Sequence, residues 1–198
     1  MAEELTREDA SLTLPDDERG AMGMRLFLLA LTMLFAASMV GYGVIRQRLG
    51  SEVDIHLPAL LWWSTLAMIL GGLAMTRALH CARGGRPAQV GRWLLIALVL
   101  SLAFLAIQIP GAWRVLQEHA VYSELNIHLY ALAFSLIVLH ALHVLGGLIP
   151  LVLVTARSLR DPQLYHSYHH GPVRYVTMYW HFLEAVWIAM FGLLLLLG

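Results

Sequence analysis

The stretch YWHFLEAVW, at positions 179–187, places a histidine and a carboxylate inside a long apolar segment. A charged side chain near the centre of a bilayer costs at least about 2.5 kcal/mol. His181 and Glu184 are three residues apart, so on a helix they share one face and can hydrogen-bond to each other. Five apolar segments occur in the chain, and Glu184 is the only acidic residue within any of them. We therefore expect other groups in a protein interior to pair with it.

The composition is that of a membrane protein. Of the 198 residues, 59% are hydrophobic, and the mean hydropathy is +0.69. The five segments lie at about 21–45, 57–79, 90–113, 126–155 and 173–197, and each is long enough to cross about 30 Å of hydrocarbon as a helix. We predict an all-α fold, an integral membrane bundle of five transmembrane helices. The formal net charge of zero indicates no basic surface for nucleic acid.

The charged residues predict the domain organisation and the orientation. Residues 1–20 are expected to form an acidic, disordered cytoplasmic tail ahead of a transmembrane domain at 21–198. Ten arginines lie on the side of the membrane that holds the N-terminus, and three lie on the other. Because arginine is enriched in cytoplasmic loops, we expect a multi-pass protein of the inner (plasma) membrane, with the N-terminus in the cytoplasm and the C-terminus outside.

The fourth segment contains HALHVLGG at 140–147, in which His140, His143 and Gly147 share one helical stripe. At a rise of about 1.5 Å per residue, His143 lies about 18 Å deep, His181 about 12 Å and Glu184 about 16 Å. We predict a buried polar cluster of His143, His181 and Glu184, with His140 near its edge. Such a cluster could lock the last two helices together, bind a metal or relay protons.

A second histidine-rich stretch, HSYHHGP at 166–172, resembles one HxxHH box of the membrane di-iron desaturases and hydroxylases. Those enzymes need several such boxes, and the chain holds a single one. The only cysteine is Cys81, expected in a connecting loop, so no thiolate pair exists for a dinuclear copper site. We expect no catalytic residue, no metal site and no redox cofactor in this chain, with a di-iron oxygenase as the less favoured alternative.

The same residues resemble a known family. YWHFLEAVW is similar to the YWHFVDVVW signature of haem-copper oxidase subunit III, and HALHV with Gly147 is similar to that family's HGLHVxxG helix. Weaker similarities are the histidine-glycine pair 170–171, the Leu-Pro pair 57–58, and Phe104-Leu105 with Gln108. The resemblance covers nearly everything after the tail and is to the five-span bacterial form.

The resemblance implies a non-catalytic accessory subunit of a respiratory terminal oxidase. Such a subunit packs against the haem-copper subunit I, stabilises it, holds phospholipid and supports proton uptake. Haem and copper would then lie in subunit I. His140, His143, His181 and Glu184 would form a polar lock, and the helix contacts would be Gly147, Trp180 and Trp187. An accessory subunit of a nitric oxide reductase is the alternative, and an independent transporter is disfavoured by the odd number of spans.

Three positions depart from the family pattern. Leu31 stands where the first span of the family usually carries a glutamate, Ile109 follows Gln108 where another glutamate is common, and Glu184 replaces an aspartate. Two missing carboxylates weaken a proton-supply role and leave the structural role intact. The sequence does not identify the electron donor, quinol or cytochrome c, because another subunit selects it.

Overall fold

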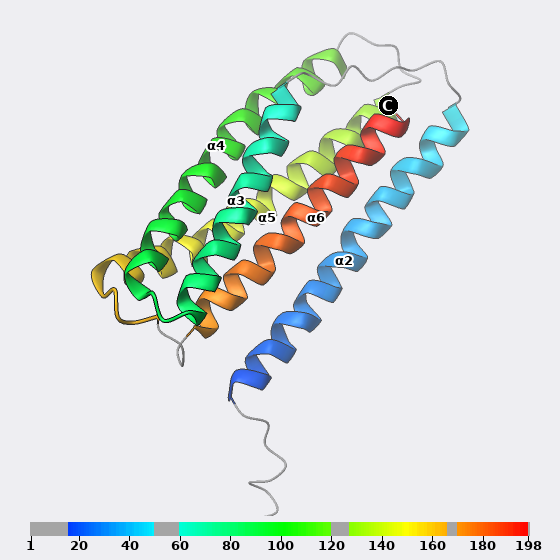
Figure 1. Cartoon of the computed structure of the whole chain (residues 1–198). Helices are drawn as coiled ribbons and strands as arrows, with labels where there is room; N and C mark the ends of the chain where they lie inside the picture. Colours follow the sequence, from blue (N-terminus) through cyan, green and yellow to red (C-terminus); the bar gives the residue numbers. More distant parts are fainter. Residues whose placement is uncertain (1–15, 50–59, 120–126, 166–169, 198) are drawn as a thin grey trace, which may run out of the picture.

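The computed structural model describes residues 16–49, 60–119, 127–165 and 170–197, and all of its long elements are helices (Figure 1). These helices are α2 (Asp16–Leu49), α3 (Leu60–Arg83), α4 (Pro87–His119), α5 (Ile127–Arg160) and α6 (Gly171–Leu197). All five are long and apolar enough to cross a membrane. The predicted fold class is therefore confirmed, and the chain is a multi-pass membrane protein.

The helices extend beyond most of the predicted spans. α2 begins at Asp16, so residues 16–20 of the expected tail are helical, while residues 1–15 lie outside the described part. α4 continues past Pro110 to His119, and α5 continues past Pro150 to Arg160. Cys81 was expected in a loop, but it lies in the last turn of α3, where it is buried. These ends are less apolar than the spans, so hydropathy alone places them outside the helices.

The connection between α3 and α4 is a tight turn. The amide of Gly84 donates to the carbonyl of His80 at 2.9 Å, and Arg86 donates to the carbonyl of Cys81 at 2.9 Å. Gly85 between them has φ 66°, in the left-handed region that glycine adopts without strain. Pro87 then begins α4, at a position where its missing N–H costs nothing. The short turn makes α3 and α4 antiparallel neighbours.

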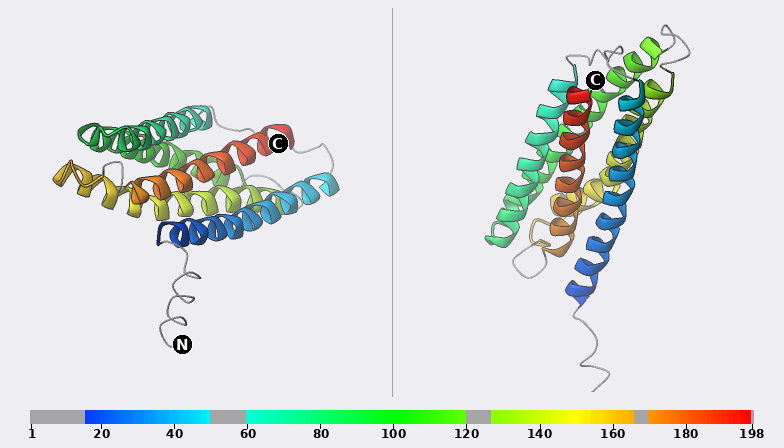
Figure 2. Two further views of the ribbon diagram at one scale, coloured as in Figure 1. Left: turned by 60° about the horizontal axis from the view of Figure 1, so that its bottom comes forward. Right: turned by 90° about the vertical axis from the view of Figure 1, so that its right-hand side faces the viewer.

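Four helices form the body of the bundle and α2 lies against one side of it (Figures 1 and 2). α3 packs on α4 and α6, and α5 packs on α4 and α6, while α2 contacts α5 and α6. The most apolar window of α2 is only 17% buried, against 39–50% for the other helices. The largest fully buried side chains are aromatic or apolar and include Trp180, Trp187, Tyr42, Phe35 and Phe104. Because lipid is as apolar as leucine, close packing of these side chains holds the helices together.

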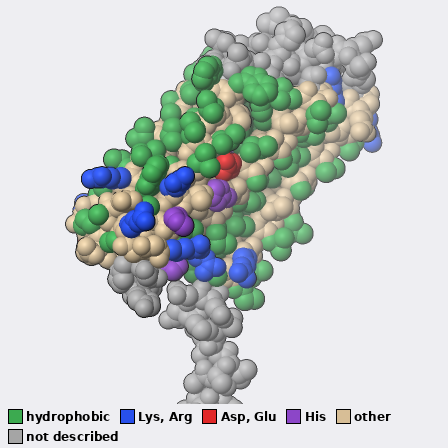
Figure 3. All heavy atoms as spheres, in the orientation of Figure 1, with side chains coloured by type: hydrophobic (Ala, Val, Ile, Leu, Met, Phe, Trp, Pro, Cys, Tyr) green, Lys and Arg blue, Asp and Glu red, His purple; other side chains and the backbone are tan. Residues whose placement is uncertain are grey.

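On the face drawn in Figure 3, hydrophobic side chains run along the length of the bundle, and basic side chains gather mainly at one end. That end carries the α3–α4 turn and the region after α5. There, outside the spans, burial raises the pKa of Tyr165, while the guanidinium of Arg157, which hydrogen-bonds to its phenol, acts in the opposite direction.

Candidate functional site

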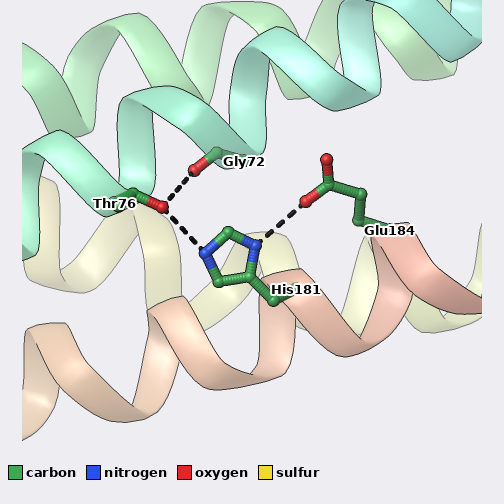
Figure 4. A network of polar contacts seen from close by, with 4 residues as sticks. All are labelled: Gly72, Thr76, His181 and Glu184. Atoms are coloured by element: carbon green, nitrogen blue, oxygen red, sulfur yellow. Dashed lines mark hydrogen bonds and ion pairs between the residues drawn. The ribbon is translucent and has the colours of Figure 1, made fainter.

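The polar residues of α6 face α3. Nδ1 of His181 lies 2.9 Å from Oε2 of Glu184, as their i,i+3 spacing predicts. On the other side of the imidazole, Nε2 lies 2.9 Å from Oγ1 of Thr76 in α3. Figure 4 shows that Thr76 and Glu184 approach opposite sides of the His181 ring. Both imidazole nitrogens are therefore engaged, and the group links α6 to α3. We call Thr76, His181 and Glu184 the polar seam.

The hydrogen-bond directions determine how many protons the polar seam holds. The hydroxyl of Thr76 donates its single proton to the carbonyl of Gly72 at 3.1 Å, so its oxygen accepts a bond from Nε2–H of His181. Nδ1 and Glu184 Oε2 then share one further proton, as a carboxyl that donates to a neutral imidazole or as an imidazolium that donates to a carboxylate. The pair has no net charge in either form, which lowers the cost of placing it among apolar side chains.

Gly72 makes room for the carboxyl group. A Cβ built at this position would lie 2.8 Å from Cδ of Glu184 and closer still to Oε2. Any larger residue at position 72 would therefore displace the carboxyl group from the seam. The seam is not sealed from the outside, since the side chain of His181 is 45% exposed and that of Glu184 is 16% exposed.

The two histidines of α5 lie apart from the polar seam. Nδ1 of His143 donates to the carbonyl of Leu139 at 2.7 Å, and its ring lies edge-on to Phe35 of α2, with centroids 5.1 Å apart. His140 is fully buried among the rings of Phe35, Phe104 and Trp187. Neither of its nitrogens has a partner among the described residues. Of the four predicted polar residues, His181 and Glu184 thus form a pair that faces α3. His143 lies separately beside α2, and His140 lies separately in the core.

Both predicted tryptophan contacts are in the core. Trp180 and Trp187 are fully buried. The indole N–H of Trp187 donates to Oγ1 of Thr65 in α3 at 2.9 Å, and its ring stacks on Phe191 with centroids 6.0 Å apart. The ring of Phe104 in α4 lies edge-on to it at 5.4 Å. One side chain of α6 thus contacts α3, α4 and α5.

At Gly147, α5 approaches α6 closely. A Cβ at this position would lie 2.6 Å from Cε1 of Tyr179 and 3.2 Å from the indole of Trp180. The hydroxyl of Tyr179 donates to the carbonyl of His143 at 2.9 Å, so the ring that occupies this space is held in place. Gly146, the preceding residue, has open space around its Cβ position.

The substitution Gly147→Ala is therefore expected to destabilise the bundle by about 1 kcal/mol, because overpacking against Tyr179 outweighs the better helix propensity of alanine. Gly146→Ala is the matched control, and it should be neutral or stabilise by up to about 1 kcal/mol. Unfolding by SDS titration in mixed micelles measures both. If both substitutions changed stability equally, α5 and α6 would have to be farther apart at Gly147 than in the structure.

A metal centre is not formed by the described residues. In the described ranges, no three His, Cys, Asp or Glu side chains are grouped so that they could hold a metal ion. Most of the HxxHH stretch, including His166 and His169, lies outside those ranges, and only His170 of its histidines is described.

An apolar groove of about 620 Å³ lies between α2, α5 and α6. Its walls include Phe27 of α2, Leu142 and Pro150 of α5, and Tyr175 of α6. It lies on the side of His143, away from the polar seam. Its size and apolar walls suit a hydrocarbon chain.

Sequence reasoning missed the α3 half of the site. Thr76 and Thr65 both hydrogen-bond to polar side chains of α6, yet each looks in the sequence like an ordinary hydroxyl within an apolar helix. The available signal was the spacing of Gly72 and Thr76, which lie one helical turn apart on the same face.

Comparison with known proteins found relatives over most of the chain. A cytochrome c oxidase subunit 3 of a Synechocystis species is 27% identical over 88% of this chain and 74% of its own length. A cytochrome c oxidase subunit 3 of Thermostichus vulcanus is 25% identical over 89% of this chain and 86% of its own. A cytochrome bo(3) ubiquinol oxidase subunit 3 of Pseudomonas putida is 25% identical over 89% and 85%. No family model matches the chain.

Proposed function

Because this chain is a homologue of subunit III of the haem-copper oxidases, we propose that it serves as a non-catalytic accessory subunit of a respiratory terminal oxidase. In this function it packs against the catalytic subunit, which holds the haem and copper, and stabilises it in the membrane. The observation that carries the proposal is the extent of the similarity, which covers 88–89% of the chain in relatives from both cytochrome c and ubiquinol oxidases.

Purification of the chain from its native membrane in a mild detergent is expected to bring a haem-containing catalytic subunit with it. Absorbance spectra detect the haem, and mass spectrometry identifies the protein. The identity of that subunit also decides between an oxygen-reducing and a nitric oxide-reducing complex. Recovery of the chain alone, with stoichiometric iron and no haem partner, would contradict the proposal and favour an oxygenase.

We propose that the polar residues of α5 and α6 stabilise the bundle and take no part in chemistry. His181 and Glu184 join α6 to α3, while Tyr179 joins α6 to the backbone at His143. His140 fills a space between aromatic rings. Together with the close approach at Gly147, these contacts hold α6 against α3 and α5.

A contribution of this chain to proton uptake would depend on Glu184 and His181. The family's first-span glutamate is replaced by Leu31, which is buried and holds no proton. The polar seam holds one shared proton, but its described contacts form a link between helices. An unchanged rate of proton uptake by an assembled oxidase with Glu184→Gln would indicate that the chain's role is structural.

We propose that the N-terminus lies in the cytoplasm and that the arginine-rich end faces the same side. The gathering of basic side chains at one end supports this orientation (Figure 3). A cysteine introduced at Leu196, which is 85% exposed near the end of α6, should react with an impermeant maleimide added outside the cell. Reaction only after the membrane is opened would reverse the orientation.

The groove between α2, α5 and α6 is proposed to hold an acyl chain of a phospholipid. Its volume of about 620 Å³ and its apolar walls support this. Phospholipid should remain with the purified chain after detergent washing, as measured by mass spectrometry of lipid extracts. Substitution of Leu142 by tryptophan should displace it.

A further inference from the structure

The polar seam lies halfway along the hydrophobic length of the bundle and opens sideways. Glu184 is 13 residues into the 27-residue helix α6, which places it about 20 Å from either end. With side-chain exposures of 45% for His181 and 16% for Glu184, both polar groups reach the lateral surface. Figure 3 shows an acidic and a histidine side chain next to each other, away from the end where the basic side chains gather. Hydrocarbon at this depth offers them no hydrogen bond.

The contacts within the chain leave one acceptor of the pair unused. His181 uses both ring nitrogens and Glu184 uses Oε2. No described residue donates to Oε1 of Glu184. Exposed hydroxyls of the helices differ from Glu184 in this respect, since those of Thr32, Ser38 and Ser135 each donate to a carbonyl of their own helix. Oε1 of Glu184 can therefore accept a hydrogen bond from a donor outside the chain. Because the His181–Glu184 pair is net neutral, this donor need not be charged.

The surface around the seam suits a helix. On α3, Leu66, Leu73 and Thr76 lie along one exposed stripe, and on α6 His181, Ala185 and Ile188 do the same. We call these six residues the α3–α6 face. Leu73 and Ile188 are 57% and 48% exposed. The small side chain of Ala185, one turn beyond His181, lets another backbone approach closely.

Two other occupants lack the required donor. An acyl chain has no hydrogen-bonding group. A second copy that paired symmetrically would present the same face, whose Thr76 hydroxyl proton is already used and whose remaining polar atom is another Oε1 acceptor. A helix of a different protein can supply a hydroxyl, amide or indole donor.

We propose that the α3–α6 face docks a transmembrane helix of the oxidase's catalytic subunit, and that a side chain of this helix donates a hydrogen bond to Oε1 of Glu184. This inference rests on the proposed function and adds to it which of the lateral faces makes the contact. The opposite side of the body, where α4 and α5 meet, then faces lipid or other components.

Photocrosslinking in the native membrane tests this assignment. The photoreactive residue p-benzoylphenylalanine replaces Ile188 on the α3–α6 face. As the matched control it replaces Leu145, which is 50% exposed and lines an apolar groove between α4 and α5. The expected result is an adduct with the catalytic subunit from position 188, several-fold more abundant than from position 145. Mass spectrometry of the adduct identifies the helix that is reached.

The outcomes separate the two proposals. An adduct with the catalytic subunit from position 145 and not from position 188 would overturn the docking face and leave the accessory function in place. Adducts from position 188 only with lipid, or only with a second copy of the chain, would overturn it as well. Absence of a haem-containing subunit from preparations of the unsubstituted chain would instead refute the proposed function.

Discussion

Replacement of Trp187 by alanine is expected to destabilise the bundle by about 3–5 kcal/mol, the range for removal of a fully buried large aromatic side chain. The indole is inaccessible and contacts Phe191, Phe104 and His140, and its N–H is bonded to Thr65. Because these neighbours belong to four different helices, they cannot all move inward to fill the cavity. SDS titration in mixed micelles, followed by circular dichroism, measures the loss.

Two further substitutions separate packing from hydrogen bonding. Trp187→Phe keeps an aromatic ring but loses the hydrogen bond to Thr65. The lost hydrogen bond should lower the free energy of unfolding by about 1 kcal/mol, in addition to the loss caused by the smaller ring. Trp63→Ala removes an indole that is 64% exposed, and it should change stability little. A loss for Trp63→Ala as large as that for Trp187→Ala would mean that the indole of Trp187 does not occupy the centre of the bundle.

The sequence predicted the five helices because the length and apolarity of a segment determine whether it can span a membrane. The bond between His181 and Glu184 was also foreseeable, since i,i+3 neighbours on a helix lie on the same face. The helix ends were less predictable. The last turns of α4 and α5 carry polar and basic residues, and a hydropathy pattern cannot distinguish such turns from loops.

The partners of α6 could not be predicted from its own sequence. Sequential neighbours are the natural first assumption, and it pairs the polar residues of α6 with His143 of α5. In the structure, α6 lies between α3, α5 and α2, and its polar face meets Gly72 and Thr76 of α3. The rotation of a helix about its own axis depends on which neighbours have small residues opposite large ones. The rotation of α6 is therefore set by how its side chains fit those of the neighbouring helices, and the periodicity of α6 alone does not predict it.

Replacement of Glu184 by leucine is expected to leave the chain inserted and to loosen both the bundle and its hold on the catalytic subunit. The change removes the bond to His181 and leaves Nδ1 of the imidazole without a partner, which costs the bundle about 1–2 kcal/mol. Leucine also removes the acceptor Oε1 from the interface, and a loss of about 2 kcal/mol there corresponds to a roughly 30-fold weaker retention of the catalytic subunit. Haem absorbance per mole of purified chain measures the retention.

The matched variant Glu184→Gln tests whether the pair is a neutral hydrogen-bonded unit. A glutamine amide N–H can donate to Nδ1 of His181, while its carbonyl oxygen remains an acceptor for the partner helix, so retention of the catalytic subunit should stay close to that of the unsubstituted chain. Both protonation forms of the His181–Glu184 pair are net neutral. If only hydrogen bonds hold the interface, replacing the carboxyl group by an amide should therefore change retention little. If Glu184→Gln loses the catalytic subunit as fully as Glu184→Leu, the carboxyl group must have a role that requires its charge or its proton. If neither variant loses it, Glu184 does not contribute to the interface, and the α3–α6 face must be held by its apolar residues alone.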